Sequence, residues 1–436
     1  MKKLNKSDLV YFIEKFIPDS LIKKHRENKT SPIWKKQHLA YWLAERKLKC
    51  TNRPLNVVFL VLYPSVWKYD SVYKLMEKDP MFNPLVLICP VLDRGYEHMV
   101  ETLHGTQDLF RSRGYNTKLA YDEATGTYIN LDSLSPDILM YAFQWASHTD
   151  PRFDMEHTRK YLKCYVNYSY KNNPFRWSIA CEAQSLMWLY FSECEDNKRL
   201  IQSFSKAEFQ NVRVVGYPMY DEFKTTAPTA KDWKLAKTGR KKIIWAPHHT
   251  IEGFDSAIKL STFLLFADTM VEMAQKYKDQ IEIVFKPHPQ LKPALYNHPK
   301  WGKERTDAYY EWWEKTENTN YVMGAYVDLF LSSDAMIHDC HSFTVEYLYV
   351  NKPVMFMTNF DRESQCNEVG KKALACHYHG QTATDIEQFI QKVVLDGEDS
   401  MLDKRTAFYN NILVPPNNMS VAENIIHCIK KELKKI

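Results

Sequence analysis

The stretch that most constrains the fold is residues 327–356, where helical and strand-like segments alternate. A short apolar run at 335–337 is followed by a polar group that contains Asp339, His341 and Ser342. Residues 343–349 have helical spacing, and Pro353 separates them from the apolar run 354–356. A strand, a helix and a second strand in this order predict a parallel pair, with the polar group at the carboxyl end of the first strand.

The same alternation recurs along the chain and predicts an α/β fold. Strands are expected at 56–62, 82–90, 117–120, 136–141, 163–167, 212–217, 242–245, 281–286, 335–337 and 354–356. Helices are expected at 7–25, 34–48, 70–77, 96–112, 258–277, 306–315, 343–349, 386–395 and 420–435.

A chain of 436 residues is too long for one ordinary core, so we expect two Rossmann-like domains. The expected parts are a basic helical segment at 1–52, a first Rossmann-like domain at 53–224, a second Rossmann-like domain at 239–410, and a helix at 411–436 that packs back on the first domain. The polar residues 225–238 are expected to be a linker.

Composition excludes several classes of protein. Glycine is scarce, at 12 residues, and neither GxGxxG nor GxxxxGK[ST] occurs, which removes the main support for dinucleotide and P-loop sites. The nine cysteines include no CxxC pair, which is typical of reduced thiols in a cytosolic protein. No apolar run approaches the ~18 residues that a membrane span needs.

The positive charge is concentrated at one end. Residues 1–50 carry 13 Lys and Arg against 5 Asp and Glu, so this segment has a net charge of +8 while the whole chain has +5. Such a segment suits an anionic membrane surface, and it is also typical of a solvated helical face. No nucleic-acid-binding module is present, so no nucleic-acid partner is expected.

Three strand ends in the second half finish in polar clusters. These are His248, His249 and Thr250, then Lys286 and His288, then Asp339, His341 and Ser342. Because neighbouring parallel strands end on one edge of a sheet, all three clusters are expected to line one site. Imidazole, ammonium and hydroxyl groups are donors suited to a diphosphate. Glu346 lies one helical turn further on and would face a ribose hydroxyl or pair with a lysine.

Other interpretations of these residues stay open. His248 and His249 could bind a metal ion, but adjacent residues rarely point at one ion and no HExxH occurs, so no metal and no cofactor is expected. His288 stands between two prolines and could be a rigid turn residue. Asp339 could cap a helix, and Ser342 could be the N-cap itself.

Several segments of the second half resemble the CDP-glycerol glycerophosphotransferase family of teichoic-acid and capsule transferases. They are VGYPMYD at 215–221, WAPHH at 245–249, FKPHP at 285–289, DAMIHDCHS at 334–342 and KPVMF at 352–356. The resemblance implies a GT-B-like fold, in which two Rossmann-like domains face a central cleft and the C-terminal domain holds the nucleotide donor.

The resemblance also implies roles for individual residues. His288 matches the histidine of the family's HP motif, which is implied to contact donor phosphates, and His288 is also a candidate catalytic residue. Asp339 and Ser342 match the acidic and last hydroxyl positions of its TDxSS-type motif, and His341 replaces the first serine of that motif.

One motif of the family is missing. Its N-terminal domain has HGxxxK, whereas residues 166–171 read VNYSYK, without the histidine or the glycine. Candidates for the acceptor-activating base are His148, Asp150 and Asp70, which lie near expected strand ends. Tyr63 and Tyr168 are expected on the acceptor side.

The resemblance predicts transfer of a glycerol-phosphate or ribitol-phosphate unit from a CDP-activated donor, favoured over a UDP donor. The acceptor would be a hydroxyl of a lipid-linked or oligosaccharide cell-envelope or capsule polymer. The chain would be cytoplasmic and peripheral on the inner face of the bacterial membrane, bound through its basic N-terminal segment. Two alternatives stay open: a GT-B glycosyltransferase with a nucleotide-sugar donor, and an inactive nucleotide-binding scaffold.

Overall fold

The chain forms two compact units, each with its own parallel sheet. The computed structural model describes residues 31–435 except 94, 145–147, 156, 237, 253–259 and 359–362. Unit 1 comprises Met1–Asp221 and Pro415–Ile436, and unit 2 comprises Glu222–Val414. The helix expected over 7–25 lies outside the described residues.

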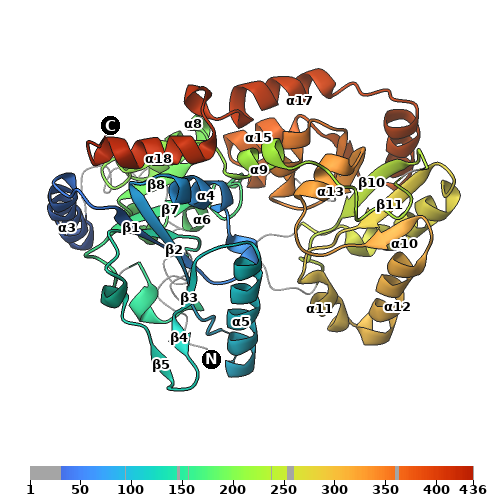
Figure 1. Ribbon diagram of the computed structural model, residues 1–436. Helices are drawn as coiled ribbons and strands as arrows, with labels where there is room; N and C mark the ends of the chain where they lie inside the picture. The colour runs from blue at the N-terminus through green and yellow to red at the C-terminus, as the bar shows by residue number, and fades with distance from the viewer. Residues whose placement is uncertain are drawn as a thin grey trace. The chain divides into compact units, whose positions relative to one another are not determined.

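Unit 1 is built on a parallel sheet (Figure 1). Its strands follow the order β3-β2-β1-β6-β7-β8-β9. The strands are β1 Leu55–Val61, β2 Phe82–Ile88, β3 Thr117–Leu119, β6 Ile138–Tyr141, β7 Leu162–Val166, β8 Leu189–Ser192 and β9 Val212–Val214. A separate antiparallel pair consists of β4 Tyr121–Asp122 and β5 Thr127–Tyr128.

Helices cover both faces of this sheet because alternate residues of each strand are buried on opposite sides. On one face, Val57 and Phe59 of β1 share a core with Ile425 of the C-terminal helix. On the other face, Val58 and Leu60 share a second core with Ile201. The helices of unit 1 are α3 Pro32–Lys49, α4 Asp70–Lys78, α5 Tyr96–Ser112, α6 Arg176–Ile179, α7 Glu182–Ser185, α8 Glu195–Phe204 and α18 Val421–Glu432.

The C-terminal helix α18 lies beside α4 and completes unit 1 although it follows unit 2 in sequence (Figure 1). The Asp221 carboxylate accepts hydrogen bonds from the backbone N–H groups of Val421 and Ala422, both at 2.9 Å, and so caps this helix. Gly216 adopts a φ of +95°, and a Cβ there would lie 2.9 Å from Val421 and 3.0 Å from Pro415. A glycine is therefore required where this helix begins.

Unit 2 has a parallel sheet with the order β12-β11-β10-β13-β14-β15. Its strands are β10 Lys241–Ala246, β11 Ile281–Phe285, β12 Thr319–Tyr321, β13 Ala335–His338, β14 Val354–Met357 and β15 Tyr378–Gly380. Its helices are α10 Phe263–Lys276, α11 Leu291–Tyr296, α12 Gly302–Lys315, α13 Val327–Ser332, α14 Phe343–Glu346, α15 Glu368–Leu374, α16 Ala383–Gln388 and α17 Leu402–Phe408, and α9 Met219–Thr225 spans the boundary between the units.

The order of this second sheet identifies where a ligand would bind. Counted from β10, the strands stand in the order 3-2-1-4-5-6, so the direction of winding reverses between β10 and β13. In open α/β sheets, ligands bind beyond the carboxyl ends of the strands at such a switch point. The loops after β10, β11 and β13 are the loops that carry the predicted polar clusters.

Some elements differ from the sequence-based expectation. β8, β12 and β15 were not expected, and the helix expected at 343–349 ends at Glu346 and continues as a 3₁₀ turn, Tyr347–Val350. The expected linker 225–238 instead packs on unit 2. Trp233 is buried and donates to Ser332 Oγ at 2.8 Å, and Thr229 donates to the Asp328 carboxylate.

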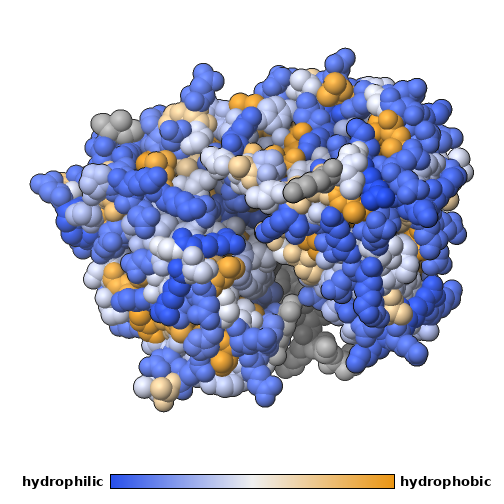
Figure 2. Space-filling model, turned by 45° about the vertical axis from the view of Figure 1, so that its right-hand side comes forward, coloured by the Kyte–Doolittle hydropathy of each residue, from blue (hydrophilic) through white to orange (hydrophobic). Residues whose placement is uncertain are grey.

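Within the described part of the chain, no helix is long and apolar enough to cross a membrane. The face drawn in Figure 2 is largely hydrophilic, and its apolar side chains are scattered.

Candidate functional site

Three histidines converge at the carboxyl edge of the sheet of unit 2. His248 and His249 follow β10, and His288 follows the neighbouring strand β11. The ring centroids of His249 and His288 are 4.0 Å apart, those of His248 and His288 5.0 Å, and those of His248 and His249 4.2 Å. Two strand ends thus bring three imidazoles to one place.

Backbone hydrogen bonds decide which nitrogen of two rings carries the proton. His288 Nδ1 accepts the N–H of Gln290 at 3.1 Å, and His248 Nδ1 accepts the N–H of Thr250 at 3.4 Å. A nitrogen that accepts an N–H is deprotonated, so each neutral ring carries its proton on Nε2. His248 and His288 therefore each offer an Nε2–H donor.

Burial keeps two of the three rings, His249 and His288, neutral. Desolvation lowers the pKa of His249 to about 4, and desolvation together with the nearby His249 lowers the pKa of His288 to about 3. Both rings are uncharged at neutral pH. They can therefore act there as neutral hydrogen-bond donors.

The same three histidines could also share a metal ion, because one ring nitrogen from each lies within 4.8 Å of the others. Among the described residues, they are the group with this property. Neutral imidazoles are good zinc ligands. However, a metal at Nε2 needs the proton on Nδ1, and in His288 that proton would face the N–H of Gln290. The observed hydrogen bonds therefore favour an anion over a metal ion at this cluster.

Asp339 fixes the backbone of this cluster at His248. It follows β13 and is 1% exposed, and its carboxylate accepts the N–H of His248 at 2.5 Å, the N–H of Thr262 at 2.6 Å and the hydroxyl of Thr262 at 2.9 Å. Burial raises its pKa to about 6. Asp339 was expected to contact donor phosphates. The structure corrects this expectation, because its carboxylate is enclosed and already bonded to the protein.

Three other predicted residues of unit 2, namely Lys286, Thr250 and Glu346, are buried. Lys286 is buried, its Nζ donates to the Gly324 carbonyl at 2.9 Å, and burial lowers its pKa to about 8. Thr250 is buried, and its hydroxyl accepts the N–H of Leu260 at 2.9 Å. Glu346 is buried beside Tyr326, which does not fit the expected contact with a ribose.

His341 and Ser342 are partly exposed at the carboxyl end of β13. The side chain of Ser342 makes no capping hydrogen bond to the short helix α14. Because β13 lies next to β10, both residues are on the edge of the sheet that carries the three histidines.

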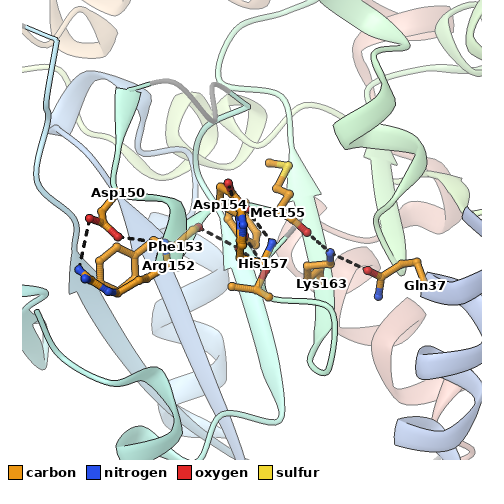
Figure 3. Close-up of polar contacts among 10 residues, drawn as sticks. Gln37, Asp150, Arg152, Phe153, Asp154, Met155, His157 and Lys163 are labelled. Carbon is orange, nitrogen blue, oxygen red and sulfur yellow. Dashed lines mark hydrogen bonds and ion pairs between the residues drawn. The ribbon is translucent and has the colours of Figure 1, made fainter. Parts of the chain in front are cut away.

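Two of the three predicted bases in unit 1 have structural roles. Asp150 accepts the N–H of Arg152 at 3.0 Å and pairs with its guanidinium at 3.3 Å (Figure 3). Asp70 opens α4, pairs with Lys74 at 2.7 Å and accepts the hydroxyl of Tyr115. Both carboxylates therefore stabilise local structure.

The third candidate, His148, lies near the carboxyl end of β2. Its carbonyl accepts the N–H of Leu92 at 3.0 Å, its Nδ1 lies 3.7 Å from the Asp93 carboxylate, and its side chain is one-third exposed. A partly exposed imidazole beside a carboxylate has the properties of a general base. Of the three candidates, His148 is the one we retain.

A buried polar network in unit 1 was not predicted. Glu193 follows β8, and its carboxylate accepts hydrogen bonds from the side chains of Asn167 at 2.9 Å and Asn197 at 3.0 Å and from the N–H of Lys171 at 3.2 Å. Burial raises the pKa of Glu193. The sequence signal was the apolar run of β8 ending in an acid.

The predicted acceptor-side residues lie at strand ends of unit 1. Tyr63 follows β1, and Tyr168 follows β7, and both are partly exposed. The Lys171 ammonium lies 4.3 Å from the centroid of the Tyr168 ring, where a cation is attracted by the aromatic face. The ring of Tyr168 is thereby held next to the Glu193 network.

The fold is shared with solved structures of low sequence identity. Against S. aureus MnaA with UDP, the TM-score is 0.57 at 12% identity, with 88% of this chain and 98% of that chain covered. Against the UDP-GlcNAc 2-epimerase from Neisseria meningitidis bound to UDP-GlcNAc, the TM-score is 0.54 at 15% identity, with 87% of this chain and 100% of that chain covered. Against a variant of the wall teichoic acid polymerase TagF, the TM-score is 0.59 at 13% identity, with 92% of this chain and 94% of that chain covered.

These likenesses show the fold. The chain has the two-domain α/β fold with parallel sheets that GT-B enzymes have, as its sequence predicts. A search of curated protein sequences finds no match.

The sequence itself identifies the family. The model of the CDP-Glycerol:Poly(glycerophosphate) glycerophosphotransferase family matches residues 180–431, which is more than half of the chain. The chain therefore belongs to this family and is a transferase, and the resemblance seen in its motifs is confirmed.

Proposed function

We propose that this chain transfers a glycerol-phosphate or ribitol-phosphate unit from a CDP-activated donor to a hydroxyl of a growing cell-envelope or capsule polymer. Membership of the glycerophosphotransferase family supports this reaction. The TagF structures, whose titles describe a wall teichoic acid polymerase and in one case a CDPG soak, share the fold.

The reaction moves one phosphoryl group between two oxygens. The acceptor hydroxyl oxygen forms a bond to the β-phosphorus of the donor, and the bond from this phosphorus to the bridging oxygen breaks. CMP leaves with the bridging oxygen and its negative charge, and a base takes the hydroxyl proton. Donors that lie at the departing oxygens lower the barrier because they stabilise charge as it develops.

The observation that carries this proposal is the convergence of His248, His249 and His288 at the switch point of the second sheet. Neutral imidazoles with protons on Nε2 donate to phosphate oxygens without needing a low pH. His341 and Ser342, on the same edge, would add donors. We propose that these side chains hold the diphosphate of the donor.

Purified protein with a panel of CDP- and UDP-activated donors tests the reaction. We expect release of CMP from CDP-glycerol or CDP-ribitol in the presence of a soluble polyol-phosphate acceptor, and a rise in melting temperature with the CDP donor alone. The absence of both effects for every donor would overturn the proposal.

We propose His148 as the group that accepts the proton of the acceptor hydroxyl. The family motif that supplies a histidine is replaced by Val166 and Asn167, and Asp70 and Asp150 are bonded to neighbouring residues. A His148→Gln variant should lose at least ~100-fold in kcat, the range of a missing general base, while donor binding is unchanged. Full activity of this variant would exclude His148.

A sugar transferase is the second candidate. The missing HGxxxK motif favours it, and the structures of MnaA with UDP and of a UDP-GlcNAc 2-epimerase bound to UDP-GlcNAc share the fold. Release of UDP from a UDP-sugar, with no release of CMP from any CDP donor, would identify this reaction. An inactive scaffold would bind nucleotide without releasing any product.

We also propose that the acceptor is lipid-linked and that the protein works on the inner face of the bacterial membrane. The support is the net charge of +8 over residues 1–50, of which residues 1–30 lie outside the described part of the chain. Attraction to anionic lipid contributes roughly 1 kcal/mol for each Lys or Arg near the surface. Removal of residues 1–30 should therefore weaken co-sedimentation with anionic vesicles.

A further inference from the structure

A buried carboxylate of unit 1, that of Glu193, is not used by the proposed reaction. Glu193 follows β8 and is 4% exposed. A buried carboxylate is stable only when donors surround it, and the donors here are the side chains of Asn167 and Asn197 and the N–H of Lys171. We call these four residues the Glu193 clamp. Because β7 lies next to β8, the clamp joins the end of β8 to the loop that follows β7.

The clamp holds the loop 167–171 at both of its ends. At the start of the loop, the side chain of Asn167 donates to Glu193 at 2.9 Å. At the end of the loop, the N–H of Lys171 donates to Glu193 at 3.2 Å, and the carbonyl of Lys171 accepts a hydrogen bond from Asn197 at 2.8 Å. Asn197 lies in α8 and also donates to the second oxygen of Glu193 at 3.0 Å. Both backbone polar groups of Lys171 are therefore fixed to β8 and α8.

Lys171 in turn holds the ring of Tyr168. The Lys171 ammonium lies 4.3 Å from the centroid of this ring, where the aromatic face attracts it. The ring cannot turn away without losing this contact. Glu193 and Lys171 are buried, whereas Tyr168 is partly exposed. Of these three residues, Tyr168 is thus the one that can contact a ligand.

The position and chemistry of Tyr168 fit a ligand that carries hydroxyl groups. Tyr168 follows β7 at the carboxyl edge of the sheet, where α/β folds bind their ligands. A phenol hydroxyl both donates and accepts, and so does a polyol hydroxyl. We propose that Glu193 is a positioning residue, which holds the Tyr168 ring for contact with a polyol-phosphate acceptor. This inference rests on the proposed function for the identity of the acceptor.

The clamp also gives a role to the altered motif at 166–171. The resemblance would place a glycine at position 167, and a glycine has no side chain that could donate to Glu193. Asn167 stands there instead and supplies that donor. In this chain, a side-chain network therefore fixes the loop that carries Tyr168.

Glu193→Gln tests the inference because it keeps the shape of the side chain and removes one acceptor. The new amide nitrogen would face the amide nitrogen of Asn197, so one hydrogen bond of the clamp is lost. We expect KM for a synthetic glycerol-phosphate trimer to rise about tenfold, with KM for CDP-glycerol unchanged. An unchanged KM for the trimer would overturn the inference. If Glu193→Gln does not fold, Asn167→Ala removes one donor of the clamp and carries the same expectation.

The matched control is Glu282→Gln. Glu282 is also a fully buried carboxylate, and it accepts the N–H groups of Lys234 at 2.6 Å and Leu235 at 3.0 Å in unit 2. This variant should lose stability in urea while both KM values stay unchanged. If it raises KM for the trimer as much as Glu193→Gln does, the effect follows from lost stability and the inference is wrong.

A double-mutant cycle distinguishes positioning from a general structural role. Tyr168→Leu removes the ring and should itself raise KM for the trimer. If Glu193 acts through Tyr168, adding Glu193→Gln to Tyr168→Leu has no further effect on this KM. If the two effects multiply, Glu193 does not act through Tyr168, and the inference fails.

Calorimetry separates this inference from the proposed reaction, because binding of the trimer requires no turnover. In the presence of CMP, the trimer should bind Glu193→Gln about tenfold more weakly than it binds the unaltered chain. This result without CMP release from CDP-glycerol would contradict the proposed function and support the clamp. CMP release together with equal trimer binding would support the function and contradict the clamp. Absence of trimer binding to the unaltered chain would also overturn the inference.

Discussion

At the scale of single residues, the position of one proton decides what the histidine cluster can bind. His288 accepts the N–H of Gln290 through Nδ1, which leaves its proton on Nε2. Glutamine can place an N–H close to the position of Nε2, whereas asparagine reaches only the position of Nδ1.

We therefore expect His288→Gln to retain part of the activity and His288→Asn to lose about 100-fold or more in kcat/KM for the donor, the cost of one missing donor to a transition-state oxygen. His298→Asn is the control. Like His288, His298 accepts through Nδ1 the backbone N–H of the second residue after it, here Lys300 at 3.3 Å, but His298 lies outside the cluster. Equal loss in the two His288 variants would contradict the assigned tautomer.

Asp339 supports the cluster by holding the backbone of His248 and the start of α10. In Asp339→Asn, the amide group would face at least one of the N–H groups that the carboxylate now accepts. We expect a loss of about 1–3 kcal/mol in the free energy of unfolding and a rise in KM for the donor. Urea denaturation and initial rates measure the two effects.

Asp334→Asn is the matched control, since Asp334 stands at the other end of β13 and accepts the N–H of Lys242 at 2.8 Å. This variant should lose stability without a change in KM for the donor. If both variants raise KM equally, Asp339 acts only on stability.

The sequence predicted the histidine cluster but not the role of Asp339. His248 and His288 stand directly after apolar strands, and neighbouring parallel strands end at one edge, so their proximity follows from the pattern. The partners of Asp339 are backbone groups of His248 and Thr262, which lie 91 and 77 residues earlier. Local sequence carries no signal for such bonds.

At the scale of elements, the structure explains why the family-like segment 215–221 contains a glycine and an aspartate. Gly216 provides a positive φ and the space for Val421 and Pro415, and Asp221 caps α18. We expect Gly216→Ala to destabilise unit 1 by about 2–4 kcal/mol, because strain at this φ and overpacking add.

Gly239→Ala is the control for backbone strain alone, because Gly239 has a φ of +78° and nothing lies within 4 Å of its added Cβ. It should cost about 1 kcal/mol. Thermal unfolding monitored by circular dichroism compares the two. A similar loss in both variants would mean that the contact with α18 contributes little.

The long strands were identified from the sequence, whereas some of the short ones were not. β1, β2 and β11 are mostly apolar strands of five or more residues, and the sequence identified all of them. β12 and β15 have three residues each, TNY and YHG, and form because a neighbouring strand supplies their hydrogen bonds. The end of α16 in a π-helical segment, Phe389–Leu395, also has no signature in the pattern of apolar residues.

At the scale of the whole molecule, buried histidines predict a loss of stability in mild acid. Desolvation lowers the pKa of His377 to about 3, as it lowers those of His249 and His288. Each value lies below the ordinary 6.5, so the unfolded chain takes up protons first as the pH falls, and the folded state loses stability from about pH 6.5 downward. Asp339, with its pKa raised to about 6, opposes this trend between about pH 6 and 4.

We expect the melting temperature to be lower at pH 5 than at pH 7.5, and the difference to shrink in His377→Asn. His377 is fully buried and donates from Nδ1 to the Ala373 carbonyl, so the asparagine removes a titrating group and can keep a donor at the position of Nδ1. The slope of the free energy of unfolding against pH should fall by up to about 1 kcal/mol per pH unit. An unchanged slope would mean that His377 does not control acid stability.

The return of the chain to unit 1 has a consequence for its synthesis. Residues 222–414 are contiguous and can fold as soon as they leave the ribosome, whereas unit 1 lacks α18 until residues 421–432 are translated. The apolar surface of α4 and β1 that α18 covers thus stays open during translation of unit 2. Nascent chains of this protein are therefore expected to complete their second unit before their first, and to need a chaperone on the unfinished one.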